Sequence, residues 1–409
     1  MEISKKNFIW NMIGTTISSF NSLFFLIIAT RVNGLDKAGI FSFGFSFACL
    51  FYIIGIYSGR VFQVTDIDKE NDSYSYINNH LISCFLMLVL TLIFCFVRGY
   101  SLYKFLIVFL LVLFKSLEAF SETLYAIIQL QNNLFKVGIS LFLKAIIGLL
   151  CFALVDFFTK NLILSVLALV IVNFLFMVFF DFRNTGLKLK DYNFVFKKVK
   201  KLFVIGFWPF LFTFLNLYII NLSKYIIDFV CTSDIQTIFS ILVMPATVIS
   251  LFAQFIIHPI LLEVKELLKD KNIDKLIELI KKLVLIIICF GVISIVLLYF
   301  IGIPILNFIY DVSLEKYKVF MILVLVGAIF YSISSVLSSV LVACRKVISQ
   351  TVIYIILSFM CTIISFLLIN HSYINGAIYS YLISMCLLFI AFYILTYRVL
   401  IIEFKKERK

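Results

Sequence analysis

Three charged side chains fall on one face of a long apolar segment. Lys115, Glu118 and Glu122 are three and four residues apart, so a helix would align them in one stripe. Tyr125 and Gln129 continue the stripe. A charge near the bilayer centre costs about 2.5–3.5 kcal/mol on insertion scales, so such residues face protein or a water-filled cavity. The spacing predicts a stripe that lines a cavity, while a Lys–Glu pair that only locks the helix to a neighbour would give the same pattern.

Cationic side chains also occur within or beside other apolar segments. A ring of guanidinium and ammonium groups facing a cavity would suit a phosphate or pyrophosphate, which Arg binds as a fork and Lys as a point charge. For cations at the segment ends, extension of the side chain to the lipid headgroups is the alternative. The predicted cationic cavity contains Arg31, Arg60, Lys115, Lys144 and Lys224.

Neutral polar residues and carboxylates mark further helical faces. Asn11 begins a stripe of hydroxyl-bearing residues, Gln254 lies in a polar stripe of a later segment, and Asn221 shares one face with Lys224 and Asp228. For Ser and Thr stripes, close helix packing is the better explanation. Coupling to an ion gradient would need a carboxylate at membrane depth, for which Glu118 and Glu122 are the first candidates and Asp228 the next.

The composition places these residues in a membrane protein. Of 409 residues, 63% are hydrophobic and 14% are charged, and the mean hydropathy is +1.12. Apolar runs of about 20 residues, each long enough to span a bilayer as a helix, recur throughout the chain. A soluble enzyme is excluded, and the net charge of +13 reflects basic loops rather than nucleic-acid binding. The nine Cys show no CxxC spacing and imply no metal site.

We predict twelve spans with both termini in the cytoplasm. With that orientation the inner segments carry 25 Lys and Arg and the outer loops 7, as the positive-inside rule requires. The spans are predicted at about 8–30, 38–59, 80–99, 105–130, 137–157, 161–182, 202–224, 236–260, 283–301, 319–343, 348–370 and 375–397.

The fold class that follows is an all-α polytopic membrane protein with two six-helix bundles around a central cavity. The bundles are predicted at 1–182 and 202–397, joined by a basic cytoplasmic linker at 183–201 and followed by a basic tail at 398–409. A further charged stretch, 263–282, has apolar residues at helical spacing and is predicted to lie as one amphipathic helix on the membrane surface.

The absence of other motifs narrows the function. The sequence has no phosphate-cradling loop, so ATP hydrolysis by this chain is not expected, and it has no HExxH motif. The longest outer stretch, about 303–318, is too short for the acceptor site of a membrane-embedded glycan polymerase. A transporter rather than an enzyme is therefore expected.

Two stretches resemble a known family. They are GRVFQVTDID (59–68) and YIINLSKYIIDFVCTSDIQTIFSILVMPATVISLFAQFIIHPIL (218–261), the second being similar to an Asn-x-x-Lys-Tyr stretch followed by Q-x-x-F/Y and by MPA before a Pro. With the twelve spans and compact loops, they resemble the polysaccharide-transporter branch of the multidrug/oligosaccharidyl-lipid/polysaccharide exporter superfamily.

The resemblance implies a flippase that moves undecaprenyl-pyrophosphate-linked oligosaccharide repeat units from the inner to the outer leaflet by alternating access. Such units would serve a capsule, an O-antigen or a related cell-surface polysaccharide. The residues implied by matching motifs are Arg60, Gln63, Asp66, Asn221, Lys224, Tyr225 and Asp228.

The resulting expectations are a monomer in the bacterial cytoplasmic membrane, with a lipid-linked oligosaccharide as substrate and membrane lipids around it. No cofactor is expected, apart from Na⁺ or H⁺ if transport is coupled to a gradient. A polysaccharide polymerase and glycosyltransferases are the candidate partners, and nucleic acid is not. The alternatives are a multidrug or cation exporter of the same fold, a glycan polymerase, and a scaffold for glycan assembly.

Overall fold

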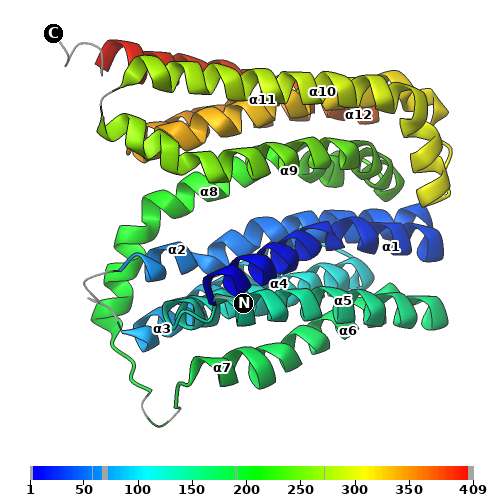
Figure 1. Cartoon of the computed structure of the whole chain (residues 1–409). Coiled ribbons are helices and arrows are strands. Elements are labelled where there is room, and N and C mark those ends of the chain that lie inside the picture. The colour runs from blue at the N-terminus through cyan, green and yellow to red at the C-terminus, as the bar shows by residue number, and fades with distance from the viewer. Residues whose placement is uncertain are drawn as a thin grey trace. The chain divides into compact units, whose positions relative to one another are not determined.

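The computed structural model describes residues 3–57, 59–66, 72–188, 190, 192–270 and 272–403, and all regular secondary structure within them is helical (Figure 1). The chain divides into two compact units, Met1–Phe214 and Leu215–Lys409. The all-α polytopic fold predicted from the sequence is confirmed, and the described residues of 183–201 belong to the first unit.

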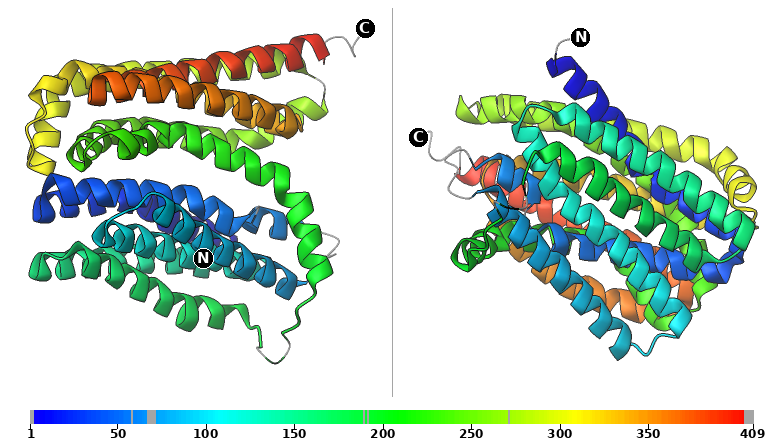
Figure 2. Two further views of the ribbon diagram at one scale, coloured as in Figure 1. Left: turned by 180° about the vertical axis from the view of Figure 1, so that it is seen from behind. Right: turned by 90° about the horizontal axis from the view of Figure 1, so that it is seen from below.

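The first unit is built around its long first helix. Helix α1 packs along α4 and α5, with α3 and α6 beside them (Figures 1 and 2). The elements are α1 (Ile3–Ile56), α2 (Gly59–Val64), α3 (Ser73–Val97), α4 (Leu102–Leu130), α5 (Leu134–Thr159), α6 (Leu162–Phe176), the π-helix η1 (Met177–Phe182) and α7 (Arg183–Thr185).

The second unit follows helix α8 (Phe196–Val230), which begins in the first unit. Helix α11 packs against α9, α10 and α12. The other elements are α9 (Ser233–Lys269), α10 (Ile273–Tyr310), the 3₁₀-helix η3 (Glu315–Tyr317), α11 (Lys318–Ala343), α12 (Val347–Tyr397) and the π-helix η4 (Arg398–Glu403).

The described residues account for the twelve predicted spans. They contain nine helical segments that are long and apolar enough to cross a membrane. The first and the last of these are each divided by a kink, at Gly34 and at Ser372–Tyr373. Helix α4, with 29 residues, adds one more span, because it is long enough to cross a membrane although it carries Lys115, Glu118 and Glu122. The chain is a multi-pass membrane protein.

The kink in α1 depends on its glycine. Gly34 has φ 80° and ψ 176°, a backbone conformation that residues with a Cβ rarely adopt. The kink turns the chain back, so that Phe25 before it and Phe41 after it both pack on Phe152 of α5, with ring centroids 5.0 and 5.7 Å away. All three rings are at most 2% exposed, and they form the centre of this part of the unit.

One prediction is wrong. Residues 263–282 do not form a single surface helix, because α9 ends at Lys269 and α10 begins at Ile273. Asn272 caps the new helix by accepting a hydrogen bond from the Lys275 amide at 3.3 Å. Amphipathic periodicity continues across such a break, so it could not reveal that two helices meet there.

Helices α1 and α5 approach closely at a pair of glycines. A Cβ at Gly138 would collide with the backbone of Trp10 and Asn11, and a Cβ at Gly14 would collide with the Gly138 carbonyl. Small residues allow such contact between membrane helices.

We therefore expect Gly138→Ala to push the two helices apart and lower the unfolding free energy by about 1–3 kcal/mol, the usual effect of overpacking. The matched control is Gly148→Ala on the same helix, where the nearest atom to a new Cβ is a Leu169 side-chain carbon at 3.4 Å. Thermal unfolding of the purified variants in detergent tests this, and equal melting temperatures for the two variants would contradict it.

Candidate functional site

A polar cavity lies inside the first unit, between α1, α4, α5 and α6. Its volume is about 330 Å³. Ring-bearing side chains from α1 and α4 form part of its wall, namely Phe25, Phe45, Tyr52 and Phe114. The polar lining consists of Ser18, Ser19, Asn21, Ser22, Lys115, Glu118, Glu122, Tyr125, Lys144 and Asn173. The charged stripe predicted on α4 therefore faces a cavity.

Lys115 is held by a carboxylate and by aromatic rings. Its Nζ lies 2.6 Å from Glu118 Oε2, one turn further along α4. The ring centroids of Phe45 and Phe114 are each 5.1 Å from the same Nζ, within the range of a cation–π interaction. The two explanations for the stripe thus hold together: the Lys–Glu pair forms, and it lines the cavity.

Glu122 connects α4 to the short helix α2. The Arg60 guanidinium lies 3.7 Å from Glu122 Oε2, and its Nε donates a hydrogen bond to Gln129 Oε1 at 2.9 Å. Gln63, also in α2 and 3% exposed, accepts a hydrogen bond from the Thr123 hydroxyl at 3.0 Å. Two predicted site residues of α2, Arg60 and Gln63, thus contact the polar face of α4.

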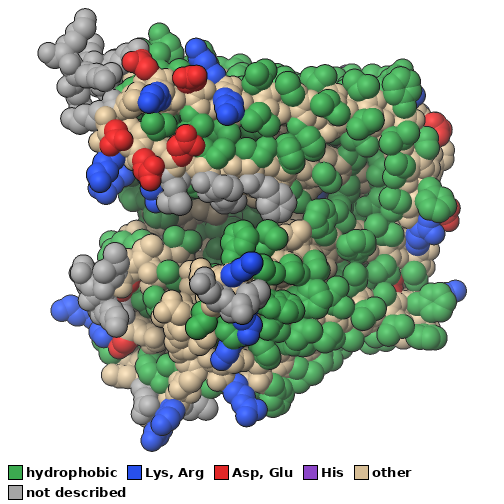
Figure 3. Space-filling model, viewed as in Figure 1, with side chains coloured by type: hydrophobic (Ala, Val, Ile, Leu, Met, Phe, Trp, Pro, Cys, Tyr) green, Lys and Arg blue, Asp and Glu red, His purple; other side chains and the backbone are tan. Residues whose placement is uncertain are grey.

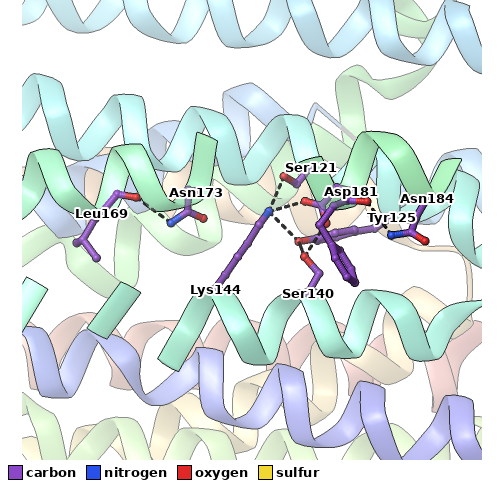
Figure 4. Close-up of polar contacts among 9 residues, drawn as sticks. Ser121, Tyr125, Ser140, Lys144, Leu169, Asn173, Asp181 and Asn184 are labelled. Carbon is purple, nitrogen blue, oxygen red and sulfur yellow. Dashed lines mark hydrogen bonds and ion pairs between the residues drawn. The ribbon is translucent and has the colours of Figure 1, made fainter. Parts of the chain in front are cut away.

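Lys144 of α5 is the most deeply buried cation of the site. Its Nζ donates to Asp181 Oδ2 at 2.6 Å, to the Ser121 hydroxyl at 2.9 Å and to the Tyr125 hydroxyl at 3.0 Å (Figure 4). Asp181 is fully buried, and its other oxygen accepts from the Ser140 hydroxyl at 2.6 Å. The hydroxyl groups that accept from Lys144 or donate to Asp181 belong to α4 and α5, and this network joins those helices to η1.

Asp181 occupies a π-helix at the end of the sixth span. A π-helical turn is rare and places one extra residue in the turn. Residues Met177–Phe182 adopt it where α6 passes Lys144, and Asp181 is directed at the ammonium group. The geometry is what a buried ion pair requires, since an unpaired carboxylate at this depth would be costly.

The cavity and its immediate surroundings are balanced in charge. Arg60, Lys115 and Lys144 pair with Glu122, Glu118 and Asp181 respectively, so three cations meet three carboxylates. The sequence analysis predicted all three cations as site residues, together with Glu118 and Glu122 but not Asp181. These six residues therefore do not form the site with excess positive charge that the sequence predicted. Each cation would gain a free hydrogen-bond donor if its carboxylate moved away.

Three other predicted residues of the first unit lie outside the cavity lining. Asp66 accepts a hydrogen bond from the Tyr76 hydroxyl at 2.9 Å. Arg31 is exposed near the Gly34 kink. Asn11 lies in the first half of α1, where its backbone carbonyl accepts a hydrogen bond from Thr15 at 2.7 Å. Its side-chain oxygen is buried with no hydrogen-bond partner within the described part of the chain. The predicted binding roles of these three residues stay predictions.

The remaining predicted residues belong to the second unit. In α8, Asn221 donates a hydrogen bond to the Leu217 carbonyl at 3.3 Å, and the Tyr225 ring stacks on Tyr218 with centroids 5.8 Å apart. Lys224 and Asp228 lie on the same helix, and all four side chains are half-buried. Gln254 is half-buried in α9. Their roles also stay predictions.

Sequence reasoning missed Asp181 and Asp156. Each is a lone acidic residue near the end of a strongly apolar run, which was the available signal. Asp156 is fully buried and accepts hydrogen bonds from Asn33 Nδ2 at 2.8 and 2.9 Å and from Ser165 at 2.8 Å. This carboxylate ties the kink of α1 to α5 and α6, and we assign it a structural role.

Comparisons with known proteins agree with this architecture. No family model matches the chain. It is 26% identical over 399 residues to the capsular polysaccharide biosynthesis protein CapF of Staphylococcus aureus, covering 95% of this chain and 98% of the relative. The lipid II flippase MurJ, in an inward closed conformation, is similar with a TM-score of 0.74 and 16% identity over 95% of this chain and 87% of MurJ.

A multidrug resistance transporter of the MATE family is also similar, with a TM-score of 0.68 and 12% identity over 98% of this chain and 100% of the transporter. The two solved structures confirm the fold, in which twelve helices form two lobes. The resemblance noted in the sequence therefore agrees with the fold of these two solved structures and with the similarity to a capsular polysaccharide biosynthesis protein over 95% of this chain.

The Lys144–Asp181 pair predicts a strong dependence of stability on both partners. Lys144→Met leaves a buried carboxylate uncompensated, and Asp181→Leu leaves a buried ammonium, so each should lower the unfolding free energy by about 3–5 kcal/mol. The double variant removes both charges and should recover most of the loss. Thermal unfolding of the four proteins measures this, and additive losses in the double variant would show that the two residues do not act as a pair.

Proposed function

We propose that this transporter flips lipid-linked oligosaccharide repeat units from the inner to the outer leaflet of the bacterial cytoplasmic membrane. The observation that carries the proposal is the polar cavity inside the first unit, with three ion pairs at or beside it, in a chain similar over 95% of its length to a capsular polysaccharide biosynthesis protein. The carrier lipid would be undecaprenyl pyrophosphate, and both termini of the protein would lie in the cytoplasm.

The cavity lining suits a glycan headgroup. Its hydroxyl, amide and carboxylate groups offer donors and acceptors to sugar hydroxyls, and its rings offer apolar faces to sugar C–H groups. A cavity of about 330 Å³ falls at the small end of the range for ligand sites, which suits one or two sugar rings rather than a whole repeat unit. The polyprenyl chain needs no polar site, because it can remain in lipid.

The ion pairs supply a means of binding the pyrophosphate. A phosphate oxygen can replace a carboxylate as the partner of Lys115 or Arg60, since both anions accept charge-assisted hydrogen bonds. The displaced Glu118 or Glu122 would then carry an uncompensated charge at membrane depth, which a proton or a sodium ion can neutralise. Substrate binding and ion binding would be linked through the same two pairs.

The second candidate is a multidrug or cation exporter. The observation that favours it is the charge balance, because a site with as many carboxylates as cations could also accept a cationic ligand. Its prediction is the reverse of the flippase prediction, namely that loss of a carboxylate, not of Lys115, abolishes binding.

The flippase proposal predicts a specific lipid phenotype. Depletion of the protein in its host should cause intact lipid-linked repeat units to accumulate on the cytoplasmic face, as measured by leaflet accessibility to a membrane-impermeant glycan label. Wild type should reverse the accumulation, and Lys115→Gln should not, because it removes the ammonium that would bind the pyrophosphate.

The matched control is Lys104→Gln on the same helix. Lys104 lies outside the cavity, with its Nζ 4.1 Å from the Tyr100 ring, and its substitution should leave flipping intact. Unchanged lipid-linked intermediates after depletion would overturn the proposal, and full rescue by Lys115→Gln would remove Lys115 from the binding site.

A separate prediction concerns coupling. If Glu118 and Glu122 take up the driving ion, then the double variant Glu118→Gln, Glu122→Gln should transport without responding to proton or sodium gradients. Flipping in proteoliposomes with imposed gradients measures this. A gradient response equal to that of wild type would show that the coupling ion binds elsewhere, without affecting the assignment of the substrate.

A further inference from the structure

The basic residues of this chain are not distributed alike between its two long polar segments. Segment 183–201 contains seven Lys and Arg and one Asp, whereas segment 263–282 contains six Lys and five Asp and Glu. The formal charges are therefore +6 and +1 over stretches of almost equal length. Both segments border membrane spans, so the difference is not explained by orientation alone.

Described residues of the first of these segments are hydrogen-bonded to the N-terminal part of α3. Asn78, which is 1% exposed, donates from Nδ2 to the Asn193 carbonyl at 3.0 Å and accepts from the Tyr192 hydroxyl at 2.6 Å. The Tyr74 hydroxyl donates to the Lys188 carbonyl at 2.8 Å. A segment held by a buried amide presents its other side chains from a defined position.

An ion pair adds to this attachment. Lys198 Nζ lies 3.1 Å from Asp72 Oδ2, and Asp72 also caps α3 by accepting from the Ser75 amide at 2.8 Å. Partial burial acts to raise the pKa of Asp72, but the hydrogen bonds from Ser75 and Lys198 outweigh it and lower that pKa, so the Asp72 carboxylate stays ionised at neutral pH.

The outer side of this segment combines aromatic and basic side chains. Tyr192, Phe194 and Phe196 are 46%, 50% and 66% exposed, and Lys190, Lys197 and Lys200 are exposed beside them in sequence. We refer to these six residues as the basic–aromatic surface. Val204 and Trp208, which lie one and two helical turns after Lys200 in α8, are exposed apolar residues.

A basic and aromatic stretch that is followed by an apolar stretch is typical of the boundary of a membrane. Aromatic side chains favour the headgroup level, and lysines extend their ammonium groups to phosphates while their stems remain in apolar surroundings. In Figure 3, Lys and Arg are prominent at the left-hand ends of the first unit's helices, and hydrophobic side chains cover much of their visible flanks.

We propose that the basic–aromatic surface binds the headgroups of anionic phospholipids. Segment 183–201, which carries this surface, contains seven Lys and Arg beside a membrane span, and a cluster of four to eight such cations is typical of binding to anionic lipids. Segment 263–282 would bind these lipids weakly, because its acidic residues cancel its lysines. The surface would make stability and activity of the transporter depend on lipid charge, whatever substrate it carries.

The test measures the affinity of the full-length protein for phosphatidylglycerol in detergent micelles by native mass spectrometry, with phosphatidylcholine as the neutral lipid. The triple variant Lys190→Gln, Lys197→Gln, Lys200→Gln should bind phosphatidylglycerol on the order of 100-fold more weakly, at about a factor of five per lysine. The loss should shrink at high salt, which screens exposed charges.

Two further triple variants make the test specific. The matched control, Lys265→Gln, Lys275→Gln, Lys281→Gln, removes three exposed lysines from segment 263–282 and should leave the affinity unchanged. Replacement of Lys190, Lys197 and Lys200 by Arg preserves the charge and should preserve binding, which also shows that the surface tolerates substitution.

Equal affinity of the wild type for the two phospholipids would overturn the proposal, as would equal losses in the two Gln variants. A short polyprenyl pyrophosphate serves as a third ligand. If the triple Gln variant of the basic–aromatic surface binds this pyrophosphate more weakly than wild type but binds phosphatidylglycerol equally well, the surface recognises the carrier lipid. In that case the phospholipid proposal is wrong. The measurement requires no transport, so its outcome is independent of the flippase assay.

Discussion

The constraint on which the first unit depends is that a charge inside a membrane protein needs a partner. Placing Lys115, Glu118, Glu122 and Lys144 among apolar helices is costly unless each meets an opposite charge. Much of the local structure serves that need. Helix α2 brings Arg60 to Glu122, and the π-helix at the end of the sixth span brings Asp181 to Lys144.

The same constraint makes the cavity suited to transport. A buried ion pair is weak evidence for stability, because apolar residues of similar size often serve as well. Three such pairs at or beside one cavity are better explained by a need for charges that can change partners. The proposed exchange of a carboxylate for a phosphate keeps every charge compensated, so the barrier to moving an anionic headgroup into the membrane interior is lowered without any covalent step.

The sequence was sufficient for the fold and for five of the six charged residues in the ion pairs. Apolar run lengths predicted the spans, and helical periodicity correctly aligned Lys115 with Glu118. The partners from distant segments could not be predicted, because which face of one helix meets another depends on packing. Asp181 illustrates this well: only a π-helical turn, invisible to a 3.6-residue periodicity, directs it at Lys144. The prediction of a single surface helix at 263–282 was wrong for a related reason, because the apolar periodicity continues across the helix cap at Asn272.

The most direct test of the account is an experimental structure of the protein with a bound polyprenyl-pyrophosphate oligosaccharide. We expect density for the headgroup in the cavity between α1, α4 and α5, with a phosphate oxygen at Lys115 or Arg60 and the corresponding glutamate displaced. A headgroup bound elsewhere, with Lys115 and Glu118 still 2.6 Å apart, would contradict it.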